Sequence, residues 1–154
     1  DIDQFGAYNN RYGHPAGDDA LRQVASVIET HARRPLDVCG RYGGEEFVVF
    51  WIEGRENEIE DHAEALRAAI EDAAIAHATS KVSSVVTVSI GLCHVKQPQE
   101  HDSLSAVLAC ADALLYEAKA AGKNQVFASP IITTAKKPSS EKSGSPRLVA
   151  NESF

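Results

Sequence analysis

Two pairs of acidic residues stand where strands of a sheet are expected to meet loops. Asp1 and Asp3 open the chain, and Glu45 and Glu46 directly follow two glycines. Carboxylates held on rigid strands are the usual protein ligands of Mg²⁺, which completes its octahedral shell with water and substrate phosphates. Short acidic turns are also common on protein surfaces, where they bind nothing. The spacing alone leaves both interpretations open, a metal site or solvated turn acids.

The overall composition excludes several classes of function. The 154 residues include 15 Lys and Arg against 22 Asp and Glu, and the net charge of -7 would repel a nucleic acid polymer or an anionic membrane. No apolar run approaches the roughly 20 residues of a membrane-spanning segment. Three cysteines without a CxxC spacing and six histidines without a ligand spacing predict neither a zinc site nor a disulfide framework. We expect one soluble, cytoplasmic domain.

Hydrophobic periodicity divides the chain into helices and strands that would position these acids. Apolar residues recur at helical spacing in three stretches: 18 to about 35, 59–74, and 104 to about 121. Asp18 is a good N-cap for the first helix, and Gly122 suits the end of the third. Runs of β-branched and apolar residues predict strands at 38–41, 47–51, 82–95 and 126–127. The unbroken apolar run at 47–51 predicts a strand that is buried on both faces.

The two ends of the chain differ from its middle. Asp1 has no turn or cap residue before it, so we interpret the start as the end of a strand whose earlier residues are absent. From Thr134 onward the sequence turns to Ser, Lys, Pro and Gly with almost no apolar pattern, too little to offset the entropy of ordering. We therefore assign 1–130 to one folded domain and 131–154 to a disordered C-terminal tail.

A seven-residue motif connects the acids to a known family. Residues 41–47, RYGGEEF, closely resemble the signature turn of the GGDEF family of diguanylate cyclases in its GGEEF form. Further blocks agree in the same order, at 1–9, 13–18, 88–91 and 111–119. The resemblance covers residue 1 to about 127 and says nothing of the tail. Gly6 and Asn10 depart from the family pattern, which has Lys and Asp at these places.

The resemblance implies a fold and a reaction. The fold would be α/β of the α+β kind, a palm-like sheet flanked by helices that is related to the catalytic domains of nucleotidyl cyclases, with the first strand largely missing. The reaction would join two GTP molecules into cyclic di-GMP and release two pyrophosphates. It would use Mg²⁺ or Mn²⁺, in a homodimer in which two domains pair about a two-fold axis.

The same resemblance assigns roles to the acidic residues. Asp1 and Glu45 would be side-chain ligands of the metal ion, and Ile2 would contribute its backbone carbonyl. Glu46 would bind a second ion or activate the attacking 3′-hydroxyl, while the role of Asp3 is left open. As a set, the catalytic residues implied are Asp1, Glu45 and Glu46.

Other matched positions would bind the nucleotide. Asn9 and Asp18 map to guanine recognition, although alone they would be a loop amide and a helix cap. Phe5 would offer its backbone amide to phosphate. Gly43 and Gly44 would also belong to the substrate site, because a tight hairpin needs positive φ and a side chain would obstruct the approach of the phosphate, although alone they would be only a hairpin turn.

Two basic elements complete the nucleotide-binding set. Lys119 and Lys123 fall where the family places phosphate-binding cations, although two lysines near a helix C-terminus also compensate its dipole. Arg34 and Asp37 form an RxxD pair at the offset of the family's product-inhibition site. A second arginine that often completes that site is Ala65 here.

Two other functions remain open at this stage. A truncated or degenerate domain could bind GTP or cyclic di-GMP as a regulatory module without turnover, and the intact Glu45 and Glu46 argue for the enzyme instead. A cyclase for another nucleotide could share the fold, and the guanine readers Asn9 and Asp18 argue against it.

Overall fold

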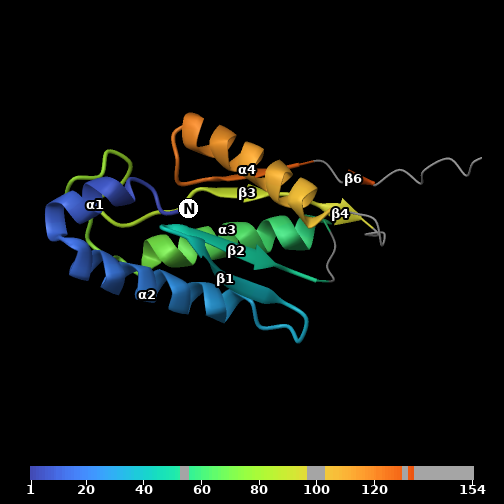
Figure 1. Ribbon diagram of the computed structural model, residues 1–154, viewed down its shortest axis with the longest axis horizontal. Helices are drawn as coiled ribbons and strands as arrows, with labels where there is room; N and C mark the ends of the chain where they lie inside the picture. The colour runs from blue at the N-terminus through green and yellow to red at the C-terminus, as the bar shows by residue number, and fades with distance from the viewer. Residues whose placement is uncertain (53–55, 97–102, 130–131, 134–154) are drawn as a thin grey trace, which may run out of the picture.

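The computed structural model describes residues 1–52, 56–96, 103–129 and 132–133 (Figure 1). The helices are α1 (Phe5–Tyr12), α2 (His14–His31), α3 (Glu56–Asp72) and α4 (Leu104–Ala120). The strands are β1 (Val38–Gly43), β2 (Glu46–Phe50), β3 (Ile90–Leu92), β4 (Val95–Lys96), β5 (Val126–Ala128) and β6 (Ile132–Thr133). Within these ranges, no helix combines the length and the apolar character needed to cross a bilayer.

The described strands pair two by two, and the start of the chain joins two of the pairs. β1 and β2 form an antiparallel hairpin, β3 runs parallel to β5, and β4 runs parallel to β6. The N–H of Ile2 donates to the carbonyl of Glu45 at 3.3 Å, just before β2. On its other side, the N–H of Ser89 donates to the carbonyl of Asp1 at 3.0 Å, just before β3. Residues 1–3 therefore connect the hairpin to the second strand pair.

A largely apolar space separates β2 from β3. This interstrand cavity has a volume of about 520 Å³, and β2, β3, α3 and α4 contribute its walls. The apolar side chains that line it include Val48, Phe50, Ile70, Val107, Leu108 and Leu115. Among the described residues, β2 pairs only with β1, and β3 pairs only with β5. Each of these two strands therefore has one edge without a partner strand.

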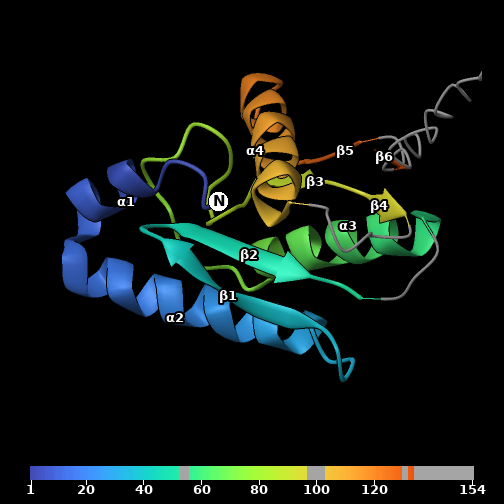
Figure 2. The same ribbon diagram turned by 45° about the vertical axis from the view of Figure 1, so that its right-hand side comes forward.

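Helices pack on both sides of the strands (Figure 2). On the side of α2 and α3, the helical spacing is confirmed, because Leu21, Val24, Ile28 and Leu66 are all buried. On the other side, α4 crosses β3 at Gly91, where an added Cβ would overlap backbone atoms of α4. Glycine is therefore required for the close approach of this helix.

The boundaries of the first helices differ from the sequence prediction. Asp18 is not the N-cap of the first long helix, because α2 already begins at His14, with Gly13 as N-cap and Pro15 in its first turn. Proline fixes the φ angle that the first turn needs, so the helix starts earlier than the apolar stripe suggests. The sequence prediction also missed α1. Its signal was present, since Phe5 and Tyr8 stand three residues apart and both are buried.

The long strand predicted at 82–95 is wrong. Only its last part forms strands, β3 and β4, while Val85 and Val88 make single bridges to Ala76 and Ile2. A β-prone segment becomes a strand only where a neighbour supplies a continuous ladder. The prediction that the strand at 47–51 is buried on both faces is also wrong. These residues are half-buried, because they line the interstrand cavity.

The predicted tail is described only at its beginning. β6 (Ile132–Thr133) lies inside the range that we assigned to the tail, and it pairs with β4. Residues 134–154 lie outside the described residues. The domain boundary at 130 and the disorder of the tail therefore stay predictions.

Candidate nucleotide and metal site

The structure brings the two acidic pairs to one end of the strands, beside the chain start (Figure 1). The contact is direct, because the Ile2 N–H bonds to the carbonyl of Glu45. Asp1 and Glu46 also line the interstrand cavity, so the two acidic pairs lie on one side of the strand end.

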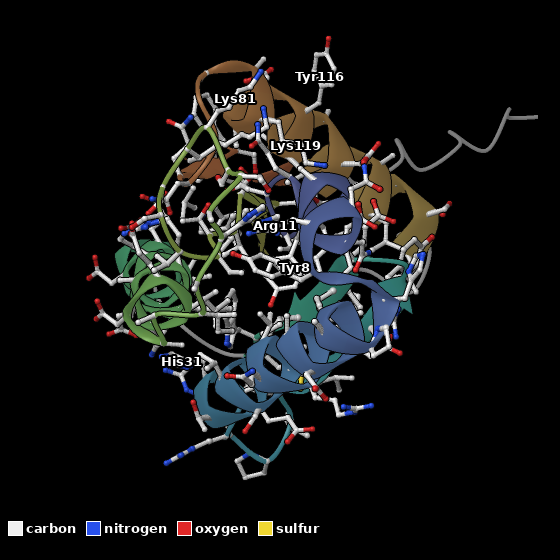
Figure 3. The ribbon with its side chains drawn as sticks, turned by 90° about the vertical axis from the view of Figure 1, so that its left-hand side faces the viewer. Tyr8, Arg11, His31, Lys81, Tyr116 and Lys119 are labelled. Atoms are coloured by element: carbon white, nitrogen blue, oxygen red, sulfur yellow. The ribbon has the colours of Figure 1, made fainter. Side chains whose placement is uncertain are left out.

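Of the two lysines near the C-terminal end of α4, Lys119 contacts an acid of the site and Lys123 contacts the helix end. Nζ of Lys119 lies 3.0 Å from Oδ2 of Asp1, whose side chain is only 8% exposed. Figure 3 shows Lys119 projecting from α4 on the side where α1 lies. Lys123 follows in a turn with φ 67°, and its Nζ donates to the Lys119 carbonyl at 3.4 Å. Lys123 thus makes the helix-end contact that was the alternative to phosphate binding.

The available oxygen donors fit a divalent ion that takes some of its ligands from the protein and the others from a substrate. Glu45 and Glu46 are half-buried, and their carboxylates make no hydrogen bond or ion pair to another described residue. In the described part of the chain, no three His, Cys, Asp or Glu side chains converge into a closed metal cage. Mg²⁺ often takes only one or two protein carboxylates and completes its shell with phosphate and water. Asp1, Glu45 and the Ile2 carbonyl suit such an open site.

A second cavity lies between α2 and β1. Its volume is about 370 Å³, and Asp18, Leu21, Arg41 and Phe47 are among the residues that line it. An apolar wall with a few polar groups is the usual form of a site for a planar organic ligand. Asp18 therefore faces a space that could accept a base, although it does not cap α2.

Asn9 brings an unsatisfied acceptor close to Asp18. Its Oδ1 is buried and has no hydrogen-bond partner in the described structure. Gly17, which precedes Asp18 in α2, allows this arrangement, because a Cβ on Gly17 would overlap Oδ1 of Asn9. A buried acceptor without a partner costs about 1–3 kcal/mol, which an N–H donor from a ligand would offset.

Phe5 can serve a nucleotide only through its backbone. Its side chain is 5% exposed and stacks on Tyr8 with ring centroids 5.9 Å apart, so it belongs to the core. Its N–H stands at the N-terminus of α1, the end of a helix that favours anions. The structure is thus compatible with a phosphate contact from the amide alone.

The turn between β1 and β2 contains one residue that the sequence reasoning missed. Gly44 has a φ of 53°, whereas Gly43 ends β1 without a positive φ, so the conformational argument for glycine holds only at Gly44. Nε of Arg41 donates to the carbonyl of Gly44 at 2.7 Å and steadies the turn beside Glu45. The sequence signal that could have indicated this role of Arg41 is its position, three residues before Gly44 in the turn.

Arg34 and Asp37 close the loop between α2 and β1. Oδ2 of Asp37 accepts the N–H of Arg34 at 3.0 Å, and its Oδ1 accepts the N–H of Ile52 at 3.2 Å. The N–H of Asp37 donates to the Arg34 carbonyl. Both carboxylate oxygens therefore have a structural use, and the product-inhibition role of this pair stays a prediction.

Comparison with solved structures defines the class of protein. The GGDEF domain of DgcB from Caulobacter crescentus, in complex with c-di-GMP, matches with a TM-score of 0.71 and 33% identity, over 83% of this chain and 73% of that one. The active GGEEF domain of a diguanylate cyclase from Vibrio cholerae matches with a TM-score of 0.62 and 25% identity, over 83% and 78%. The fold is therefore that of the nucleotidyl cyclase palm, as the motifs predicted.

The sequence comparisons give the family. The family model "Diguanylate cyclase, GGDEF domain" matches residues 1–125, and this chain belongs to that family. It is 37% identical to diguanylate cyclase A of Treponema denticola over 126 residues, 82% of this chain and 33% of that protein. It is also 37% identical to diguanylate cyclase VdcA of Vibrio cholerae over 128 residues, which are 82% of this chain and 37% of that protein. The chain thus spans about a third of the length of these relatives.

Proposed function

We propose that this chain is the catalytic domain of a diguanylate cyclase that condenses two GTP molecules into cyclic di-GMP. The observation that carries the proposal is the meeting of Asp1, Glu45 and Lys119 at one strand end. This arrangement sets oxygen donors for a divalent ion beside a cation for phosphate. The relatives named as diguanylate cyclases support the same reaction.

The residues around this strand end would divide the binding of GTP between them. Asn9 and Asp18 would read guanine, because an unpaired acceptor and a carboxylate match the N–H donors of its edge. Lys119 and Lys123 would bind the phosphates through their ammonium groups. Glu46, half-buried beside Glu45, would take the proton of the attacking 3′-hydroxyl.

The metal-binding residues would be Asp1, Glu45 and the Ile2 carbonyl, with Glu46 as a further candidate. A bound Mg²⁺ or Mn²⁺ would neutralise negative charge on the triphosphate. For Asp1 to serve as a ligand, its 3.0 Å ion pair with Lys119 has to open. Opening would leave the lysine free for phosphate, so the two functions of this pair are coupled.

Closing the product ring needs two copies of the site. The 3′-oxygen of each GTP forms a bond to the α-phosphorus of the other, the bond to pyrophosphate breaks, and the hydroxyl proton passes to a base. We propose that two domains pair about a two-fold axis in the cytoplasm, each presenting one GTP. The RxxD pair, Arg34 and Asp37, would bind the product.

A regulatory module that binds GTP or cyclic di-GMP without turnover is the second candidate. The observation in its favour is that, in the part of the chain that the structure describes, the hairpin and β3 are linked through residues 1–3 rather than by a continuous ladder. A metal site on so narrow a support could bind a nucleotide without the rigidity that catalysis requires.

Incubation of the chain with Mg²⁺ and GTP, followed by mass detection of the cyclic dinucleotide, separates these candidates. We expect product from GTP and none from ATP. Glu45→Gln should reduce the rate by about 100-fold or more, because a metal ligand is lost. Glu117→Gln, an exposed acid on α4, is the matched control and should retain activity. GTP binding without product would support the regulatory module, and absence of both would contradict both candidates.

A further inference from the structure

The carboxylate of Asp3 is buried and fully engaged. The residue is 1% exposed. Its Oδ1 accepts the hydroxyl of Ser89 at 2.7 Å, and its Oδ2 accepts the hydroxyl of Thr87 at 2.8 Å and the backbone N–H of Asn124 at 3.0 Å. Buried charges are tolerated where hydrogen bonds replace water in this way. Asp3 is therefore closed to solvent, unlike Glu45 and Glu46, and its role lies in what it holds together.

Asn124 is the point where three elements meet. Its side-chain Nδ2 donates to Oε1 of Glu71 at 3.1 Å, and its Oδ1 accepts NH1 of Arg67 at 2.6 Å. Both partners lie on α3, whereas its backbone N–H reaches Asp3 at the chain start. We call Asp3, Thr87, Ser89 and Asn124 the Asp3 junction. The junction fixes the loop after α4 to α3 and to the strand end that carries Asp1.

This loop contains Lys123 and directly follows the helix that carries Lys119. Lys123 and Asn124 have φ values of 67° and 49°, two successive residues in the left-handed region. Non-glycine residues avoid that region, although Asn tolerates it better than Lys. Such a conformation persists only where neighbours hold it, and the bond from the Asn124 N–H to Asp3 is such a restraint. Lys123 precedes this bond directly, and Lys119 lies one helical turn before it.

We propose that Asp3 and Asn124 are positioning residues for the phosphate-binding lysines Lys119 and Lys123. The inference rests on the proposed function. The junction holds the loop after α4 so that the Lys119 ammonium remains beside Asp1 and the Lys123 ammonium remains at the end of α4, next to the Lys119 carbonyl. Asp3 is thereby not a metal ligand, although it stands two residues from one.

The decisive comparison is between two substitutions of Asp3. In Asp3→Asn the amide oxygen can still accept from Thr87 and Asn124, while its NH₂ donates to the Ser89 hydroxyl, which can accept. In Asp3→Ala the N–H of Asn124 loses its partner. Asn124→Gly is a third variant, because glycine tolerates the positive φ and keeps the backbone N–H but removes the side-chain contacts to α3.

Two measurements on these variants test the proposal. Amide hydrogen exchange without nucleotide should accelerate about 10-fold or more at residues 122–125 in Asp3→Ala, and Asp3→Asn should stay within about threefold of wild type. Exchange in the core of α2, at Val24 and Ile28, should not change. Binding of GTP with and without Mg²⁺, measured by calorimetry, should weaken about 10-fold in Asp3→Ala and Asn124→Gly under both conditions, because the lysines rather than the metal are displaced.

Each other outcome contradicts the inference. If Asp3 were a metal ligand, Asp3→Asn and Asp3→Ala would both raise the Mg²⁺ requirement, with unchanged exchange at 122–125. If Asp3 were only structural, exchange would accelerate in α2 as much as in the loop. Failure of the wild-type chain to bind GTP would contradict the proposed function, while the exchange experiment would still decide whether the junction holds the loop.

Discussion

The Asp3 junction and the interstrand cavity lie next to each other, because Ser89 belongs to both, and they are built in opposite ways. In the junction, both oxygens of a buried carboxylate accept hydrogen bonds. Two of the donors, Thr87 and Ser89, lie just before β3, and the third, Asn124, follows α4. In the cavity apolar side chains of β2, β3 and α4 face a space of about 520 Å³. Directional bonds fix atoms in place, whereas a loosely filled apolar space tolerates change. Precision at the candidate site should therefore come from the junction.

The largest effect is expected at Gly91, where β3 meets α4 beside the cavity. In Gly91→Ala the new Cβ would overlap the Ala111 carbonyl and the Leu115 nitrogen, both backbone atoms that cannot rotate away. We expect the free energy of unfolding to fall by about 2–4 kcal/mol, measured by urea denaturation.

Gly6→Ala is the matched control for this substitution. An added Cβ at Gly6 meets nothing within 4 Å, and Gly6 lies inside α1. This change should stabilise the chain by about 0.5–1 kcal/mol, because alanine is the better helix former. A loss below about 1 kcal/mol in Gly91→Ala would instead show that the cavity lets α4 move away from β3.

Thr87→Val tests the junction itself. The substitution keeps the shape of the side chain and removes a hydroxyl that donates to a buried carboxylate at 2.8 Å. We expect a loss of about 1.5–3 kcal/mol in the free energy of unfolding, since bonds to charged groups are the strong ones. Thr79→Val removes an exposed hydroxyl that donates to the Ala7 carbonyl at 3.2 Å, and it should cost about 0.5 kcal/mol. Similar losses would mean that burial of the carboxylate adds nothing.

Much of the fold could be predicted because it follows from local patterns. The helical stripe at Leu21, Val24 and Ile28 and the hairpin around Gly44 both have signals within a few residues. The strand predicted at 82–95 failed because pairing is not local, and β propensity says nothing about whether a neighbour is present.

The candidate site was predictable through its motifs but not through its supports. The resemblance named Asp1, Glu45 and Lys119, and the structure brings them together. Nothing in the sequence showed that Asp3 would bond to Asn124, which is 121 positions away. Partners at such separations follow from packing of whole elements, and no periodicity encodes them.

A matched pair of substitutions compares the cavity with the closed core. Val24→Leu adds one methylene on α2, where the side chain is 0% exposed and belongs to the hydrophobic core cluster, and it should cost about 1–3 kcal/mol. Val107→Leu makes the same change on α4, where the side chain lines the interstrand cavity, and the free energy of unfolding should stay within about 0.5 kcal/mol of wild type. Both values come from urea denaturation. A comparable loss at Val107 would show that the cavity is as closely packed in solution as the core.

The smallest expected effect concerns the contact between the junction and α3, where Glu71 accepts hydrogen bonds from Arg67 and Asn124. The hydrogen bond from Arg67, and then that from Asn124, lower the pKa of Glu71, against a smaller opposing effect of burial. A carboxyl with a lowered pKa in the folded state stabilises the fold above its ordinary pKa, and this contribution is lost as the pH falls through the folded value.

Unfolding measured from neutral pH down to about pH 3 in wild type and Glu71→Gln should therefore show a difference in stability that is largest at neutral pH and shrinks in acid. Because the Glu71 side chain is 33% exposed, the difference should remain below about 1 kcal/mol. A difference that stays constant with pH would mean that the charge of Glu71 does not support the junction. In that case the hydrogen bond between Asp3 and Asn124 would not be reinforced by a charged partner on α3, and α3 would hold the loop only through neutral contacts and packing.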